Sequence, residues 1–141
     1  MRKKLLWLAV PVILLICVLV FIQVQYPRKT FDDLLGVDEA KITKVLMRSG
    51  FDMSSVETTD KDKIKELINI LDNRYYRKSF KQELISGYTY YYDFYSGNTV
   101  ILRITGSGNN VCVNTTYCNV SKEIPLHLLD IWFKSLFGKS D

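Results

Sequence analysis

The chain has 141 residues, enough for one domain with a modest core, and its formal net charge at pH 7 is +4. Three of its nineteen Lys and Arg residues (Arg2, Lys3 and Lys4) precede a long uncharged run, and all fifteen Asp and Glu residues follow it. The rest of the chain therefore carries a net charge of only about +1, which argues against nucleic acid as a partner.

Residues 5–22, LLWLAVPVILLICVLVFI, contain no charge and predict a transmembrane helix. Eighteen residues span roughly 27 Å of helix, close to the ~30 Å hydrocarbon core of a bilayer. The basic residues before the run favour a cytoplasmic N-terminus and an extracytoplasmic domain. Two alternatives stay open: a cleaved signal peptide, which would give a secreted protein, and a lipoprotein attached at Cys17. A small-residue cleavage pair is missing, and Ile16 precedes Cys17.

We therefore expect three parts: a cytoplasmic tip with an anchor (1–26), a linker (27–39) and an extracytoplasmic domain (40–141). Pro27 stops the first helix. The helical spacing of Phe31, Leu34 and Leu35 predicts one short turn in the linker, ending at Gly36.

The domain begins with a predicted strand over residues 41–48, a turn at Ser49-Gly50 and a short return strand over 54–57. Residues 59–73 predict a helix capped by Thr59. Its apolar stripe recurs at i, i+3, i+4 and i+7, in Ile64, Leu67, Ile68 and Leu71.

A basic and aromatic segment, residues 74–81, follows this helix. Its partner-binding candidates are Tyr75, Tyr76 and Arg77, for which anionic lipid head groups or cell-wall polymers are better ligands than RNA. The simpler interpretation is that the basic residues stabilise the helix C-terminus while the aromatic residues cover the core edge.

Residues 87–105 alternate apolar and polar side chains and predict a hairpin with a three-residue loop at Ser96-Gly97-Asn98. That register pairs Phe94 with Val100 and Tyr92 with Leu102, and it places Tyr91 opposite Arg103. The face carrying Tyr92 then covers the core. The opposite face presents Tyr91, Asp93, Tyr95 and Arg103, either as an ordinary wet sheet face or as a contact surface, since tyrosine and arginine are typical of binding hot spots.

A second hairpin is expected over residues 110–121, with Asn114-Thr115 at its tip. A three-residue loop would place Cys112 opposite Cys118 and allow a disulfide, which we favour in an oxidising compartment. A two-residue loop would instead pair Cys112 with Tyr117 and turn Cys118 to the other face. A last helix over 125–137 should pack on the sheet through a stripe that includes Trp132. The fold class is α+β, an antiparallel sheet with two packed helices behind a transmembrane helix.

The segments TTDKDKIKELINIL, YYRKSF, SGYTYYYDFYSG and ILRITGSGNNVCVN resemble a family of small exported domains of unknown function from Gram-positive, Bacillus-type bacteria. The resemblance covers most of residues 31–137 and implies an envelope-facing α+β domain. It implies no activity and no catalytic residue. Cys112 and Cys118 depart from the apolar and aromatic residues expected at their positions.

The chemistry-bearing residues do not form a recognisable set. The one histidine, His127, has leucines on both sides, the cysteines and acids lack metal-ligand spacing, and Gly106-Ser107-Gly108 lacks the helix and lysine of a phosphate loop. We expect no metal, no cofactor and no enzymatic activity.

The sequence therefore favours a membrane-anchored binding or regulatory module that meets an envelope protein or an anionic wall polymer. Two alternatives stay open: a structural or accessory envelope protein, and an enzyme without a recognisable motif.

Overall fold

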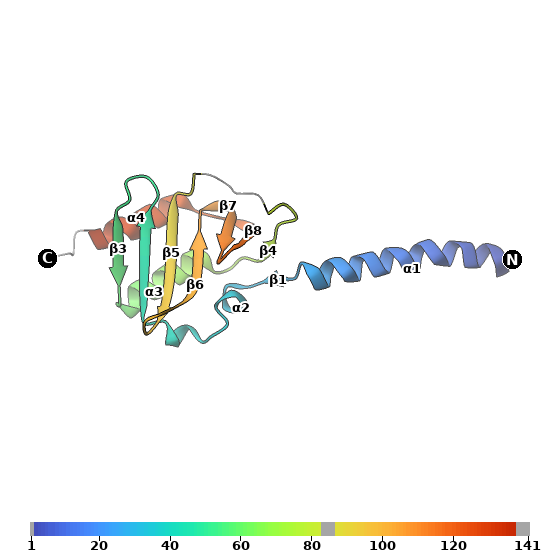
Figure 1. Ribbon diagram of the computed structural model, residues 1–141, viewed down its shortest axis with the longest axis horizontal. Coiled ribbons are helices and arrows are strands. Elements are labelled where there is room, and N and C mark those ends of the chain that lie inside the picture. The colour runs from blue at the N-terminus through green and yellow to red at the C-terminus, as the bar shows by residue number, and fades with distance from the viewer. Residues whose placement is uncertain (1, 83–86, 138–141) are drawn as a thin grey trace.

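The computed structural model describes residues 2–82 and 87–137, with side chains from residue 10 onward. Figure 1 shows an antiparallel sheet with two helices packed behind it and a long N-terminal helix that extends away from the domain. The predicted α+β class, with an antiparallel sheet and two packed helices, is confirmed. The elements in chain order are α1 (Arg2–Gln25), β1 (Arg28–Lys29), α2 (Phe31–Leu35), the 3-10 helix η1 (Glu39–Lys41), β2 (Lys44–Ser49), β3 (Ser55–Thr58), α3 (Lys61–Leu71), β4 (Tyr76–Lys78), β5 (Tyr90–Ser96), β6 (Thr99–Thr105), β7 (Gly108–Val113), β8 (Thr116–Ile124) and α4 (Leu126–Phe137).

The predicted transmembrane helix, with its signal-anchor and single-pass topology, is corrected by the structure. Across residues 2–82 and 87–137, no helix is both long enough and apolar enough to cross a membrane.

Eight strands form one sheet in the order β1-β4-β8-β7-β6-β5-β2-β3, and every neighbouring pair is antiparallel. Four of the seven neighbouring pairs join consecutive strands: β2-β3, β5-β6, β6-β7 and β7-β8. Helix α3 connects β3 at one edge of the sheet to β4 near the other, so it crosses behind the strands (Figure 1).

Helices α3 and α4 cover one face of the sheet with the stripes expected from the sequence. Ile64, Leu67, Ile68 and Leu71 are buried on α3, as are Leu129, Trp132 and Phe133 on α4. The N-cap of α3 is Asp60 rather than Thr59, because the Asp60 carboxylate accepts hydrogen bonds from the backbone N–H groups of Asp62 and Lys63. The Trp132 indole donates to the Lys63 carbonyl at 2.8 Å and joins the two helices.

The segment assigned to a linker, 27–39, contributes to the domain. β1 pairs with β4, and α2 buries Phe31 and Leu35 in the core. Helix α2 ends at Gly36 as predicted; its φ of 67° lies in the left-handed region that favours glycine.

The β5-β6 hairpin has a different register from the predicted one. Its loop has two residues, Gly97 and Asn98, and a bulge follows Phe94. Tyr92 therefore pairs with Ile104 and Phe94 with Leu102, which shifts each predicted pair by two residues while keeping the same face inward.

Candidate functional site

The face of the sheet turned away from the helices presents an ionic cluster across β2, β5 and β6. The inward face of these strands carries apolar residues such as Val45, Tyr92 and Leu102, so alternation turns Arg48, Asp93 and Arg103 outward. In the observed register Asp93 lies directly opposite Arg103 and diagonal to Arg48.

Asp93 is the centre of this cluster. Arg103 donates from Nε to Asp93 Oδ1 at 2.6 Å and from Nη2 to Oδ2 at 3.0 Å, and Arg48 donates from Nη2 to Oδ2 at 2.8 Å. The Asp93 side chain is only 1% exposed, whereas each arginine side chain is 47% exposed. The hydrogen bonds to Asp93 raise the pKa of Arg103, and the charge of Asp93 adds to this. One buried carboxylate thus orients two cations, and the cluster keeps a net positive charge facing solvent.

A pocket of about 430 Å³ opens beside the arginines. Its lining consists of Arg48, Ser49, Gly50, Met53, Tyr91, Arg103 and Thr105. Met53 is 83% exposed, and the Tyr91 ring packs edge-on against Tyr88 with centroids 6.1 Å apart. Cationic, aromatic and thioether groups therefore surround one hollow. This combination can hold an acidic group and an adjacent apolar group at the same time.

The structure brings together three of the seven partner-binding candidates predicted from the sequence, Tyr91, Asp93 and Arg103. Tyr95 lies beyond the bulge at the far end of β5, where the Lys44 ammonium group sits 4.6 Å from its ring centroid.

The candidates Tyr75, Tyr76 and Arg77 do not extend this surface. β4 is separated from β6 by β8 and β7. Tyr76 is buried and donates its hydroxyl hydrogen to the Leu71 carbonyl, and Arg77 Nε donates to the Tyr26 carbonyl.

Sequence reasoning missed Arg48 as a site residue. Its strand was expected, and alternation with Met47 could have turned its side chain outward. The pairing of β2 with β5 joins residues 45 positions apart, however, and no local pattern indicates which strand lies beside Asp93.

The predicted disulfide is not formed. The β7-β8 loop has two residues, Asn114 and Thr115, so Cys112 pairs with Tyr117 while Cys118 pairs with Val111 on the helix-covered side. Both thiols are free. Burial raises the pKa of Cys112 and raises that of Cys118 to about 11, which keeps both in the unreactive thiol form.

A second hollow lies where α3 ends and α4 begins, and His127 lines it together with Arg74. The Arg74 guanidinium donates to the carbonyls of Ile70, Asp72, Lys122 and Glu123, so it ties the end of α3 to the end of β8. Because its donors are used in this way, Arg74 has a structural role. Within residues 2–82 and 87–137, no group of three or more His, Cys, Asp or Glu residues could hold a metal ion.

Comparisons with protein families, with curated proteins and with solved structures find no match for this chain.

Proposed function

We propose that this protein is a binding module whose outer sheet surface takes an acidic side chain of a partner protein. The observation that carries the proposal is the pair of half-exposed arginines, Arg48 and Arg103, held on a buried Asp93 beside an open pocket. The working surface consists of Arg48, Met53, Tyr91 and Arg103, with Asp93 as the orienting residue.

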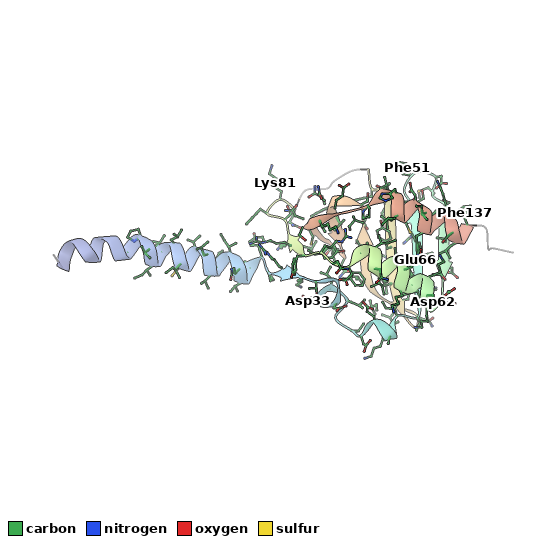
Figure 2. The ribbon with its side chains drawn as sticks, turned by 180° about the vertical axis from the view of Figure 1, so that it is seen from behind. Asp33, Phe51, Asp62, Glu66, Lys81 and Phe137 are labelled. Atoms are coloured by element: carbon green, nitrogen blue, oxygen red, sulfur yellow. The ribbon has the colours of Figure 1, made fainter. Side chains whose placement is uncertain are left out.

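The composition of this surface favours a protein over a small ligand. Arginine, tyrosine and methionine are enriched in protein interfaces. Phe51, which is 78% exposed and is labelled in Figure 2, lies in the same β2-β3 loop as Met53 and adds an exposed apolar side chain to that loop. An acidic partner residue can bind both guanidinium groups while a neighbouring apolar residue packs on Met53 and Tyr91.

We also propose that the domain works outside the cytoplasm, in line with the basic N-terminus before the apolar run and with the resemblance to exported domains. An envelope protein is then the partner to seek.

Site-specific photo-crosslinking tests the binding surface. A photoreactive residue at Met53 should capture a partner in cells, whereas one at Lys65, on the helix-covered side, should not. Adding Tyr91→Ala and Arg103→Ala should abolish capture from position 53. Because Arg103 makes two of the three hydrogen bonds to the buried Asp93 carboxylate, this double variant should also lose about 1–3 kcal/mol of stability, so circular dichroism must show that it is folded before capture is compared. Equal capture from both positions, or unchanged capture by the folded double variant, would contradict the proposal.

A further inference from the structure

Two arginines stand directly opposite each other where the N-terminal helix meets the sheet. Arg28 on β1 and Arg77 on β4 are cross-strand partners, so their side chains lie on the same face of the ladder. Like charges in this arrangement repel and destabilise the pair. Such a pair is expected where something else supplies negative charge.

These arginines line a separate hollow of about 390 Å³ together with Gln23, Tyr26 and Pro27. Among residues 2–82 and 87–137, those that line the hollow include no acidic residue. Gln23 and Tyr26 have side chains that can donate hydrogen bonds. The hollow is therefore a cationic site with donor groups and no internal counter-ion in its lining.

The position of Arg77 is fixed by its neighbours. Its Nε donates to the Tyr26 carbonyl at 3.1 Å, and the Tyr26 ring packs against Phe80 with centroids 4.5 Å apart. The contact at Nε leaves both Nη groups of Arg77 without a partner among the described residues. Preorganisation of this kind lowers the entropic cost of binding a ligand.

The Asp33 carboxylate, on the helix that follows β1, is engaged elsewhere. Asp33 Oδ2 accepts a hydrogen bond from the Thr30 backbone N–H at 2.8 Å and so caps α2. The ion pairs within the described part of the chain are made by Lys44, Arg48, Lys63 and Arg103, and none involves Arg28 or Arg77. The outer-face arginines share Asp93, whereas Arg28 and Arg77 share no carboxylate in the part of the chain that the structure describes.

We infer that the hollow between Arg28 and Arg77 binds a phosphate group. The outer-face arginines already have one negative charge, from Asp93, whereas the two guanidinium groups here have none among the described residues, so a dianionic group matches their charge better than one carboxylate does. A tetrahedral phosphate presents three or four oxygens in different directions and carries the charge that two arginines require. Lys29 and Lys78 alternate with these arginines on the same two strands and line a different hollow, so the positive charge at this site comes from Arg28 and Arg77.

The test is a calorimetric titration of the full-length protein with inorganic phosphate and with pyrophosphate. Arg28→Gln should weaken binding at least about tenfold, since one charge-assisted pair is lost. Arg28 is exposed on a two-residue edge strand, so this variant should fold. The matched control is Lys65→Gln, which removes the same charge from an exposed position on α3 and should bind like the wild type.

Thermal unfolding gives a second readout. In phosphate-free buffer Arg28→Gln should be at least as stable as the wild type, because a repulsive pair is relieved. Added phosphate should then raise the Tm of the wild type more than that of the variant. Arg103→Ala should retain phosphate binding, so failure at this hollow and failure of the outer surface can be distinguished.

The source of the phosphate is resolved by comparing vesicles of phosphatidylglycerol with vesicles of phosphatidylcholine. A preference for phosphatidylglycerol that Arg28→Gln removes identifies a lipid head group. Arg28-dependent binding of free phosphate without that preference identifies a soluble phosphate compound. If neither free phosphate nor phosphatidylglycerol vesicles distinguish the wild type from Arg28→Gln, the inference is overturned.

Discussion

Asp93 determines where two guanidinium groups of the outer surface lie, although it contributes almost no exposed surface itself. A buried carboxylate is costly to desolvate, and it is retained here because three hydrogen bonds from Arg48 and Arg103 satisfy it. The same residue therefore affects both stability and binding geometry.

Asp93→Asn keeps the volume of this side chain and removes its charge. We expect it to lower the free energy of unfolding by about 1–3 kcal/mol, because hydrogen bonds to a charged group are lost and two arginines are left facing each other. Urea denaturation measures the change. Glu57→Gln is the matched control; Glu57 is 64% exposed and lies 3.6 Å from Lys44, so its change should stay below about 0.5 kcal/mol. Equal losses of unfolding free energy in Asp93→Asn and Glu57→Gln would contradict the claim that burial makes the Asp93 carboxylate important for stability.

The capping box of α2 predicts a pH dependence. The Thr30 backbone N–H and then the Thr30 hydroxyl hold the pKa of Asp33 below its ordinary value of 3.8. Because the folded pKa is the lower one, Asp33 stabilises α2 above its ordinary pKa, and this contribution is lost as the pH falls through the lowered folded value. A carboxyl NMR titration should place the Asp33 midpoint below 3.8. A midpoint at or above that value would show that the box is not formed in solution.

At the scale of elements, Trp132 is the largest of the three side chains that α4 buries. Trp132 is fully buried and its indole binds the Lys63 carbonyl of α3. Trp132→Ala should cost about 3–5 kcal/mol, whereas Ile131→Ala next to it should cost under about 0.5 kcal/mol, because Ile131 is 60% exposed. Denaturant midpoints of the two variants check the orientation of the helix. Similar losses from both would place α4 differently on the sheet.

Gly50 joins the β2-β3 loop to the segment before β5. A Cβ atom at this position would stand 2.0 Å from the Tyr88 carbonyl oxygen, and the Gly50 N–H donates to the Thr89 carbonyl at 2.8 Å. Gly50→Ala should therefore displace residues 88–89 and lower stability by at least about 2 kcal/mol. Amide chemical-shift changes should centre on Tyr88 and Tyr91. Gly36→Ala is an informative comparison because its Cβ would meet no atom within 4 Å, so only the cost of its positive φ remains.

Periodicity predicted the elements whose pattern is local. The stripe of α3, the inward face of β5 and the turn at Gly36 follow from spacing alone. The register of β5-β6 was wrong by two residues. One residue of the shift comes from a loop of two residues where three were predicted, and the other comes from the bulge after Phe94, which leaves no mark in the alternation. Strands β1 and β4 were missed because two and three residues are too short to show a period, and they form only by pairing with each other and with β8.

The sequence predicted only part of the outer surface, because alternation identifies residues that share a face within one hairpin but not residues on a distant strand. Tyr91, Asp93 and Arg103 lie on one hairpin, so their common face could be read from alternation. Arg48 joins them only through the order of strands in the sheet, which depends on how the whole chain packs. The spacing of residues along the sequence does not indicate which distant segments lie side by side.

At the scale of the whole molecule, the core and α1 are separate. The first buried residue of the core is Phe31, and α1 contributes none to it among the described side chains. The contacts of Tyr26 with Phe80 and Arg77 join the two at the base of the helix. Figure 2 shows the side chains of α1 projecting away from the helix with no second layer against them. Its apolar residues from Val10 to Val24 are mostly more than half exposed.

This separation predicts two different consequences of removing residues 2–25. The domain should keep its free energy of unfolding within about 1 kcal/mol, because no core contact is lost. The full chain should associate in water, because a helix that is apolar on all sides buries that surface against another molecule, whereas the shortened chain should sediment as a monomer. Circular dichroism during urea denaturation and sedimentation velocity measure the two effects. A monomeric full chain in plain buffer, or a shortened chain that no longer folds, would contradict the separation of α1 from the core.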